Sequence, residues 1–201
     1  MAIIHRMVDV TKFNPAAFYP HALRMQDFQM AMQDAYDLLY DINTGLAAKS
    51  LDRLDEILRP AIMSGLLSDV ITSSLGKHAR ALEVNCYHNG HPDLILKNRF
   101  PNSSVKSGGL DGVEIKTTQN QNGSVDTHGA RDQWFCVFVY KIDKATQPPT
   151  DRAAMEFTSI YLAEVGVANF RQNARSALGT RTASLDRSGI AKLRANWVYK
   201  V

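Results

Sequence analysis

The spacing of apolar residues changes once along this 201-residue chain, just after Gly76. Before Gly76 the apolar residues recur every three or four positions, which is the period of an amphipathic helix. After Gly76 they fall in short runs and alternations separated by turn residues, which is typical of strands. A helical region followed by strands and then mixed elements predicts an α/β domain with a mixed central β-sheet flanked by helices.

Individual elements follow from the same spacing. Asn14-Pro15 combines an N-cap residue with proline at the first helical position, which favours a helix start there. Apolar spacing predicts three helices: a long one from Leu23, one from Ser50 to just before Pro60, and one over residues 62–75. Strands are expected at residues 81–87, 93–97, 113–117, 134–140, 157–165 and 197–199.

Composition limits the classes of protein to which the chain can belong. With 45% hydrophobic and 21% charged residues it is a globular chain and not a disordered one. Its longest apolar runs, such as Trp134–Tyr140, are too short to cross a bilayer, and its first residues lack the hydrophobic stretch of a signal peptide. Cys86 and Cys136 are too few for a disulfide framework or a thiolate zinc site. We therefore expect a cytoplasmic protein with reduced thiols in its core and no membrane partner.

Positive charge is concentrated towards the C-terminal end. The whole chain has a net charge of +3, yet residues 165–201 hold seven Lys or Arg against Asp186 alone. Such a segment is suited to lie along a polyanion, although a solvated basic helix face explains the charge equally well. The basic residues are Arg171, Arg175, Arg181, Arg187, Lys192, Arg194 and Lys200. We expect a single domain over 1–201, with a helical region (1–60), a core (61–165) and a basic C-terminal segment (166–201).

The most informative motif is Pro92-Asp93, followed in the next expected strand by Glu114-Ile115-Lys116. Side chains two positions apart in a strand share a face, so Glu114 and Lys116 are expected to lie together and Ile115 to point the other way. If the two strands are neighbours, Asp93 can reach the same face. Two carboxylates and an ammonium would then converge.

This combination suits Mg²⁺-dependent hydrolysis of phosphodiesters. Hard carboxylate oxygens bind Mg²⁺ while leaving positions for water and a phosphate oxygen. A metal in such a site activates and orients a water, and a nearby lysine can hold that water and offset negative charge. Asp93 and Glu114 are therefore the predicted metal ligands and Lys116 the predicted cation beside them.

A purely structural alternative is a surface strand with an ion pair and a turn aspartate that caps backbone amides. Against it, the segments that flank Glu114 are apolar enough to be buried, where an acid and a lysine are costly unless paired or bound to metal. Among the twenty acidic residues only Glu114 is followed two positions later by lysine. His88 and His91 flank the turn before Asp93, and we interpret them as part of a plain hairpin turn because no third ligand has suitable spacing.

The motif resembles that of the PD-(D/E)xK nuclease superfamily, and its surroundings resemble a type II restriction endonuclease over roughly residues 60–165. The resemblance implies a restriction-endonuclease-like core, with Asp93 and Glu114 as metal ligands and Lys116 positioning the attacking water. Many members also place an acidic residue on the helix before the first strand. Glu56 and Asp69 are both candidates for that position, and Glu83 on the first strand is a candidate for a supporting acid.

Polar side chains near the motif are candidates for contact with DNA. The segment that leaves the Glu114 strand is rich in groups that pair with base edges, in particular Gln119, Asn120, Gln121, Asn122, His128 and Arg131. Lys97, Arg99 and Lys106, between the two motif strands, are better suited to phosphate. A flexible polar surface loop would have the same composition.

These features together predict a sequence-specific double-stranded DNA endonuclease that uses Mg²⁺. Cutting both strands of a palindrome requires two sites related by a two-fold axis, so a homodimer is expected, with the long N-terminal helix as its interface. The resemblance also implies a cognate DNA methyltransferase in the same restriction–modification system. The alternatives are a DNA-repair nicking enzyme or junction resolvase of the same superfamily, a non-catalytic DNA-binding protein, and an interaction module that uses the N-terminal helix alone.

Overall fold

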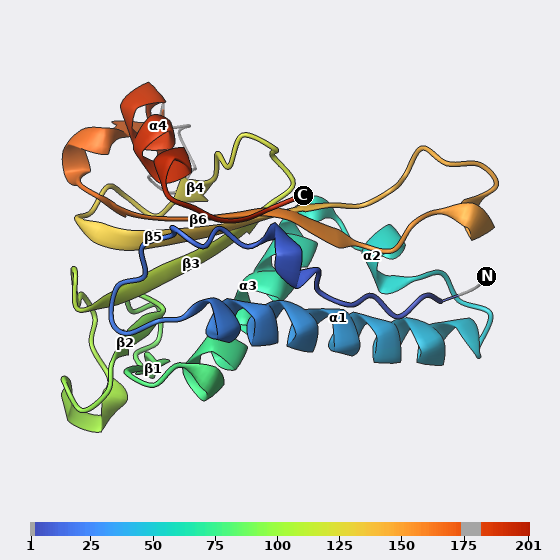
Figure 1. Cartoon of the computed structure of the whole chain (residues 1–201), viewed down its shortest axis with the longest axis horizontal. Coiled ribbons are helices and arrows are strands. Elements are labelled where there is room, and N and C mark those ends of the chain that lie inside the picture. Colours follow the sequence, from blue (N-terminus) through green and yellow to red (C-terminus); the bar gives the residue numbers. More distant parts are fainter. Residues whose placement is uncertain (1–2, 174–181) are drawn as a thin grey trace.

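The computed structural model describes residues 3–173 and 182–201. Its α-helices are α1 (Met25–Ala47), α2 (Leu54–Ile57), α3 (Pro60–His78) and α4 (Arg187–Ala195). Its strands are β1 (Leu82–Val84), β2 (Leu94–Leu96), β3 (Gly112–Thr118), β4 (Asp126–Thr127), β5 (Gln133–Lys141), β6 (Glu156–Val165), β7 (Phe170–Gln172), β8 (Ala183–Leu185) and β9 (Trp197–Lys200). The expected α/β class is confirmed (Figure 1).

The main sheet is mixed, with the strand order β1-β2-β3-β5-β6-β9. Strands β1, β2 and β3 form an antiparallel meander, whereas β3 and β5 run parallel. Strands β5, β6 and β9 are again antiparallel. A second, small sheet has the order β4-β8-β7. The chain therefore leaves the meander at the end of β3, contributes β4 to the small sheet, and returns beside β3 as β5.

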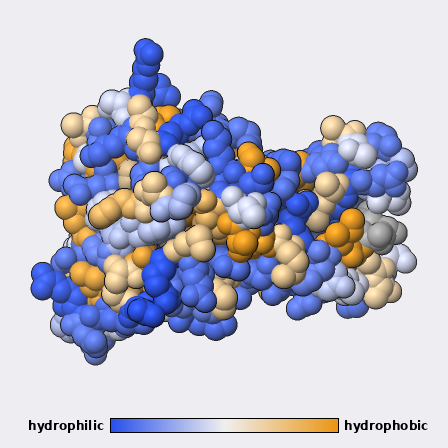
Figure 2. Space-filling view, viewed as in Figure 1, coloured by the Kyte–Doolittle hydropathy of each residue, from blue (hydrophilic) through white to orange (hydrophobic). Residues whose placement is uncertain are grey.

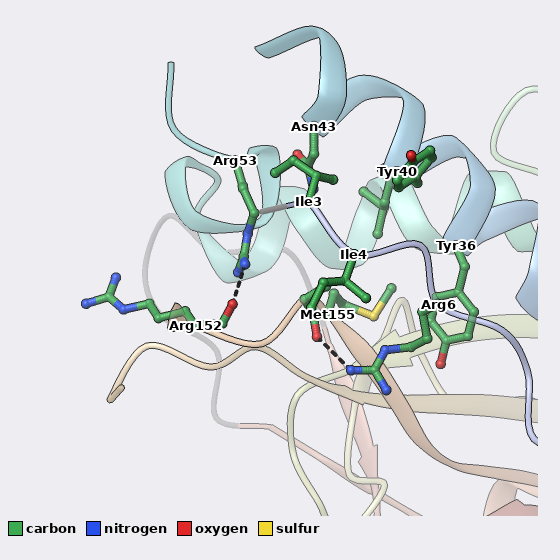
Figure 3. Close-up of a pocket in the computed structure, with 11 residues that line it drawn as sticks. Ile3, Ile4, Arg6, Tyr36, Tyr40, Asn43, Arg53, Arg152 and Met155 are labelled. Atoms are coloured by element: carbon green, nitrogen blue, oxygen red, sulfur yellow. Dashed lines mark hydrogen bonds between the residues drawn. The ribbon is translucent and has the colours of Figure 1, made fainter. Parts of the chain in front are cut away.

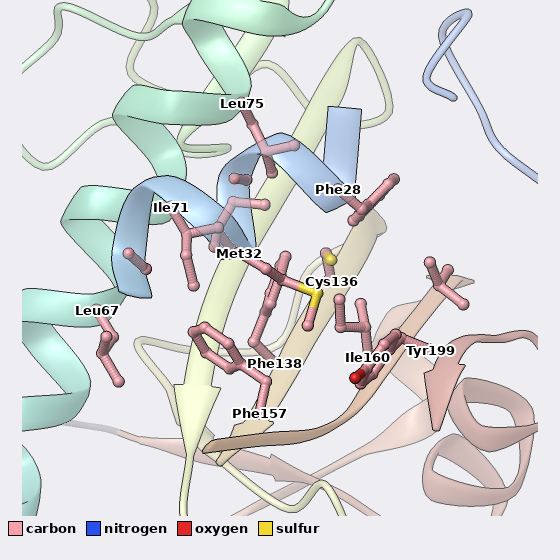
Figure 4. Close-up of a cluster of buried hydrophobic side chains, with 14 of the residues drawn as sticks. Phe28, Met32, Leu67, Ile71, Leu75, Cys136, Phe138, Phe157, Ile160 and Tyr199 are labelled. Atoms are coloured by element: carbon pink, nitrogen blue, oxygen red, sulfur yellow. The ribbon is translucent and has the colours of Figure 1, made fainter. Parts of the chain in front are cut away.

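The main sheet is buried on both faces. Figure 1 shows α1 and α3 on one side of it and α4 on the other. Cys136 and Phe138 of β5 join the larger core under α1 and α3 (Figure 4), whereas Phe135 and Val137 join a second core with Leu193 of α4. A strand covered on both faces needs apolar residues at successive positions, which explains the continuous apolar run of β5.

The N-terminal segment is less helical than its sequence predicts. No α-helix begins at Asn14-Pro15: Phe13 forms a bridge with Tyr199 of β9, and the Asn14 side chain donates to the carbonyl oxygen of Trp197 at 2.9 Å. The Asn14 side chain accepts a hydrogen bond of 3.0 Å from the backbone N–H of Ala16, as an N-cap does, but only a turn follows, and its amide group attaches the segment to the last strand. The second predicted helix shortens to the four residues of α2.

A buried ion pair accounts for the short second helix. The Arg53 guanidinium donates to both carboxylate oxygens of Asp55, at 3.2 and 3.0 Å, and to the carbonyl oxygens of Arg152 and Ala153, at 2.7 and 3.0 Å. The backbone of Arg53 is extended, so the helix begins only after it. Figure 3 shows Arg53 and Asn43 beside the N-terminal segment, around a cavity of only about 20 Å³.

The apolar stripe of α1, on which the predicted dimer interface depends, is buried within the chain. Phe28, Met32 and Tyr36 belong to the larger core. Of its remaining apolar residues, Met25 and Met30 are exposed. The face seen in Figure 2 carries scattered apolar residues among hydrophilic ones, without a continuous apolar band. The stripe that suggested dimerisation packs against the chain's own sheet, so it does not support the predicted interface. Dimerisation itself stays a prediction.

Three further predictions concern individual segments. Cys136 is a buried thiol as expected, but Cys86 is exposed, because β1 ends at Val84 and the chain then turns outward. The C-terminal segment is part of the fold: it supplies β9 to the main sheet and α4 to the second core. Across residues 3–173 and 182–201, no helix combines the length and apolar character that crossing a bilayer requires.

Candidate active site

The register between β2 and β3 brings the two motif segments together. Leu94 pairs with Val113 in this antiparallel ladder, so Asp93, just before β2, lies opposite Glu114. The Asp93 carboxylate accepts a hydrogen bond of 2.8 Å from the backbone N–H of Ile115. Gly112 permits this close approach of the two strands, because a Cβ there would collide with the carbonyl oxygen of Leu94.

Lys116 and Glu114 share one face of β3, as the spacing predicts. The Lys116 ammonium lies 2.5 Å from Glu114 Oε1 and 3.7 Å from Asp93 Oδ2. It also donates to the carbonyl oxygen of Ile115 at 3.2 Å. Three oxygen groups therefore converge on one cation, while the Ile115 side chain points into the opposite core.

His91 completes the cluster, a role that was not predicted from the sequence. Its Nδ1 lies 3.2 and 3.1 Å from the two carboxylate oxygens of Glu114. A carboxylate only accepts hydrogen bonds, so Nδ1 carries the hydrogen in this contact. Glu114 is 0% exposed and is held between an imidazole and an ammonium. The adjacency of His91 to Asp93 is visible in the sequence, but its contact with Glu114 depends on the pairing of β2 with β3.

Burial and charge act in opposite directions on these groups. Burial, together with the charge of Glu114, raises the pKa of Asp93 to about 6, although Lys116 opposes the rise. Burial alone would also raise the pKa of Glu114, but the hydrogen bond from His91 and the charge of Lys116 hold it below its ordinary value. For Lys116 the neighbouring carboxylates outweigh burial and raise the ammonium pKa. Glu114 and Lys116 are therefore a charged pair. The ionised form of Asp93 is less well stabilised by its neighbours than that of Glu114.

The cluster opens onto a cleft of about 490 Å³ between α3 and the small sheet. Asp93 and Lys116 line its floor, with Asp69 and Ser68 of α3 on one wall. The other wall includes Thr127 of β4, as well as His128 and Thr182. An adjoining hollow of about 400 Å³ also has Asp69 and Asp93 in its lining, so the two acids border both hollows.

The structure distinguishes among the three supporting acids that the sequence left open. Asp69 lies in the cleft with Asp93. Glu56 instead pairs with Arg53 at 3.3 Å, in the buried cluster at the start of α2. Glu83 accepts a hydrogen bond from the backbone of Asn98 and does not line the cleft. Asp69 alone of the three is placed to act with the motif.

The oxygen donors fit a hard divalent cation. Two carboxylates and the Ile115 carbonyl already surround one positive charge, that of Lys116, and such oxygens are what Mg²⁺ prefers. Among the described residues no group of three His, Cys, Asp or Glu side chains is arranged to hold a metal. Asp93 and Glu114 are the two side chains of the cluster that could serve as ligands, and Mg²⁺ commonly keeps several waters beside one or two carboxylates.

The predicted base-contacting residues separate into two groups. His128 lines the cleft, and Arg131 lines a further hollow beside His91. Gln119 and Gln121 lie at the far end of β3, where their side chains contact Tyr140. Asn120 and Asn122 belong to the same turn, and none of these four amide residues lines the cleft. After β3 the loop turns back to form β4. Only the second half of the loop, from β4 onward, therefore lies at the site.

The predicted phosphate-contacting residues of the meander are partly engaged elsewhere. Lys97 donates to the carbonyl oxygen of Ala79 at 2.8 Å, at the C-terminal end of α3. Arg99 pairs with Asp111 at 3.0 Å, and Asp111 lies in the turn before β3, as expected. Lys106 is exposed.

The basic C-terminal segment borders the cleft through Thr182. Arg171 on β7 is exposed, as are Arg187 and Arg194 of α4. Lys192 and Lys200 are exposed too. Arg175 and Arg181 lie outside the described residues.

No protein-family model, curated protein or solved structure matches the chain. What the protein does must therefore be inferred from its own residues and their geometry.

Proposed function

We propose that the protein is a Mg²⁺-dependent endonuclease that hydrolyses phosphodiester bonds of double-stranded DNA at a specific sequence, as the resemblance to type II restriction endonucleases implies. The observation that carries the proposal is the convergence of the Asp93 and Glu114 carboxylates on Lys116, where Asp93 and Lys116 line an open cleft and Glu114 is buried beneath them. An ion pair with a purely structural role does not need a cleft of this size beside it. The proposal is also supported by the antiparallel pairing of β2 with β3, which places the two halves of the motif on neighbouring strands.

Each side chain has a distinct part in the proposed reaction. Asp93 and Glu114 provide carboxylate oxygens for the metal, and His91 holds Glu114 in place by its Nδ1–H. The Lys116 ammonium orients the attacking water and balances charge on the reacting phosphate. Asp69 faces the same cleft and is suited to hold a further water. Bound Mg²⁺ would lower the pKa of water and polarise the phosphate oxygen.

The remaining parts of the proposal concern partners. A palindromic double-stranded site calls for a homodimer, and a restriction function calls for a cognate DNA methyltransferase that protects the same sequence in the same cytoplasm. His128 borders the cleft and Arg131 the neighbouring hollow, so both are placed to contact DNA. The exposed Arg171, Arg187 and Arg194 offer positive charge for the phosphate backbone.

Incubation of the protein with plasmid DNA of known sequence tests the proposal. Discrete double-strand fragments with Mg²⁺, and none with EDTA or with Asp93→Asn, are the expected result. Mapping the fragment ends would give the recognition sequence and the cleavage position.

The alternatives predict other outcomes of the same assay. Nicks in one strand would indicate a nicking enzyme of the same chemistry in place of a restriction enzyme. Cleavage confined to branched DNA would indicate a junction resolvase. Salt-sensitive DNA binding without any cleavage would indicate a non-catalytic DNA-binding protein. Absence of both would contradict the proposal altogether.

A further inference from the structure

The hollow of about 220 Å³ beside His91 is distinct from the cleft, since the two have no lining residue in common. Its walls include His91, Pro92 and Gly109 from the meander, and Arg131 and Gln133 from the start of β5. His91 therefore belongs to both places: its ring lines the hollow, and its Nδ1 contacts Glu114 at 3.1 Å. A molecule bound in the hollow would lie within one side chain of the proposed reaction site.

Gln133 is the unexplained residue of this hollow. It is 2% exposed, and its amide oxygen and amide nitrogen are both buried without a hydrogen-bond partner among the described residues. Burying an unpaired amide is unfavourable, because the hydrogen bonds to water that the amide loses on folding are not replaced. Gln133 begins β5, and strand alternation places it on the same face of the sheet as Phe135, the partner of Glu114.

Arg131 adds a second unpaired group to the same wall. Its Nη1 is buried and has no hydrogen-bond partner within the described part of the chain. Among the described residues no hydrogen bond joins it to the neighbouring Asp132, whose Oδ1 accepts a 2.9 Å hydrogen bond from the backbone of Val167. Two donors, Gln133 Nε2 and Arg131 Nη1, and one acceptor, Gln133 Oε1, are therefore left for a ligand.

We propose that this hollow binds one nucleobase of the DNA substrate, rotated out of the helical stack beside the phosphate that is cleaved. This step rests on the proposed nuclease function for the identity of the polymer. The edge of every nucleobase carries donors beside acceptors, and a glutamine amide pairs with such an edge through two hydrogen bonds. The His91 ring and the Pro92 ring provide flat and apolar surface of the kind on which an unstacked base packs.

The unpaired acceptor decides between a base and an anion. A phosphodiester or sulfate would satisfy Arg131, but neither has a hydrogen to donate to Gln133 Oε1. Gln133 is also too deeply buried to reach a base that stays within the duplex, so the base must enter the hollow.

The test uses the full chain, free of metal, and each of the four 2′-deoxynucleosides at millimolar concentration. Saturation-transfer NMR reports binding, and the variants are Gln133→Met, Arg131→Met and, as a control, Gln26→Leu on the exposed side of α1. At least one deoxynucleoside should bind the parent, and Gln133→Met should weaken that binding at least about tenfold. Gln26→Leu should leave it unchanged. Circular dichroism checks that each variant is folded.

The outcomes separate this proposal from the nuclease proposal. Binding that depends on Gln133 supports the nucleobase site whether or not the protein cleaves DNA. If no deoxynucleoside binds, or if Gln133→Met binds as the parent does, the nucleobase site is overturned even when cleavage is intact. Binding of inorganic phosphate in place of any deoxynucleoside would overturn it as well.

Discussion

Two clusters of buried charge in this protein are alike in composition and differ in what surrounds them. Arg53 is 3% exposed, and its guanidinium makes four hydrogen bonds, two to Asp55 and two to main-chain carbonyls. Asp55 also accepts a hydrogen bond from Asn43. The cavity beside this cluster measures only about 20 Å³, which is room for one water molecule and too small for a substrate. Its charges compensate one another and connect α1, α2 and the segment before β6.

The Asp93–Glu114–Lys116 cluster is compensated less completely and faces a cleft of about 490 Å³. Burial raises the pKa of Asp93 to about 6 despite the nearby ammonium. The comparison shows that burial of charge does not by itself mark a functional site. The two features that distinguish the second cluster are access from solvent and a carboxyl whose ionised form is only partly stabilised.

The largest effect is expected from the ligands of the open cluster. Glu114→Gln or Asp93→Asn should abolish cleavage, since each removes a charged metal ligand. DNA binding should survive, because loss of a carboxylate also removes repulsion from phosphate. Plasmid cleavage measures the activity, and a binding assay with Ca²⁺ in place of Mg²⁺ measures the affinity for DNA. Glu164→Gln, at an exposed position of β6, is the control and should cleave normally. Full activity in Asp93→Asn would show that the open cluster has no catalytic part.

The closed cluster should show the opposite behaviour. Arg53→Met leaves the Asp55 carboxylate buried without its partner and should cost about 3–5 kcal/mol of unfolding free energy. Cleavage per folded molecule should not change, because the cluster lies away from the cleft. Urea unfolding and single-turnover cleavage measure these separately, with Arg59→Met, at an exposed position, as the control. A stable Arg53→Met protein with reduced cleavage would reverse the assignment of the two clusters.

Lys116 sharpens the comparison, since it is a paired cation that is also proposed to act on substrate. Lys116→Ala should slow cleavage by about 10²–10³-fold through loss of transition-state charge stabilisation. Lys116→Arg should restore little of the rate, because a planar guanidinium cannot replace a compact ammonium at the same point. In the absence of DNA, Lys116→Ala should bind Mn²⁺ more tightly, because the ammonium no longer competes for the same oxygens. Single-turnover kinetics and metal titration provide the readouts.

A result within a few-fold of the parent rate for Lys116→Ala would contradict the catalytic role. Weaker Mn²⁺ binding by the same variant would contradict the competition between ammonium and metal.

The pKa of Asp93 predicts a pH dependence of stability in the metal-free protein. Its folded pKa, about 6, lies above the ordinary value of 3.8, so the folded state holds this proton more tightly than the unfolded chain does. The contribution of Asp93 to stability is therefore fully present below about pH 4 and is lost as the pH rises through 6. Unfolding free energy measured at several pH values should fall relative to that of Asp93→Asn over this interval. Excess Mg²⁺ should reduce the fall, and parallel curves for the two proteins would contradict the prediction.

The smallest effect per residue is expected from the exposed basic groups of the C-terminal segment. If Arg171, Arg187 and Arg194 follow the phosphate backbone, each neutralisation should weaken binding to all sequences alike. The slope of log affinity against log salt should fall by about one for each arginine that no longer neutralises a phosphate. Titrations at several salt concentrations measure the slope. An unchanged slope after replacement of all three would identify the segment as a solvated surface.

Predictions from the sequence are correct where local spacing carries the information. The change of apolar period at Gly76 predicted the order of helices and strands, and the alternation in β3 placed Glu114 and Lys116 on one face. The prediction is wrong at Asn14-Pro15, where Asn14 caps only a turn and its amide group donates to the carbonyl oxygen of Trp197, far along the chain. The amide run from Gln119 was also expected close to the site, whereas the turn after β3 carries those side chains away to Tyr140.

The sequence by itself therefore determined the types of its elements and the chemistry available on each strand, because backbone period and side-chain identity are local properties. Tertiary structure decided which elements meet. It selected Asp69 over Glu56 by packing α3 beside the cleft, and it brought His91 to Glu114 and left Gln133 unpaired through strand register. Such contacts join residues distant in the chain, and they form only when two faces of the sheet bury their apolar side chains together. The physical reason is that hydrophobic burial is not directional, so many pairings of helices and strands would be favourable. Only the complete set of packed elements makes one of these arrangements the most stable.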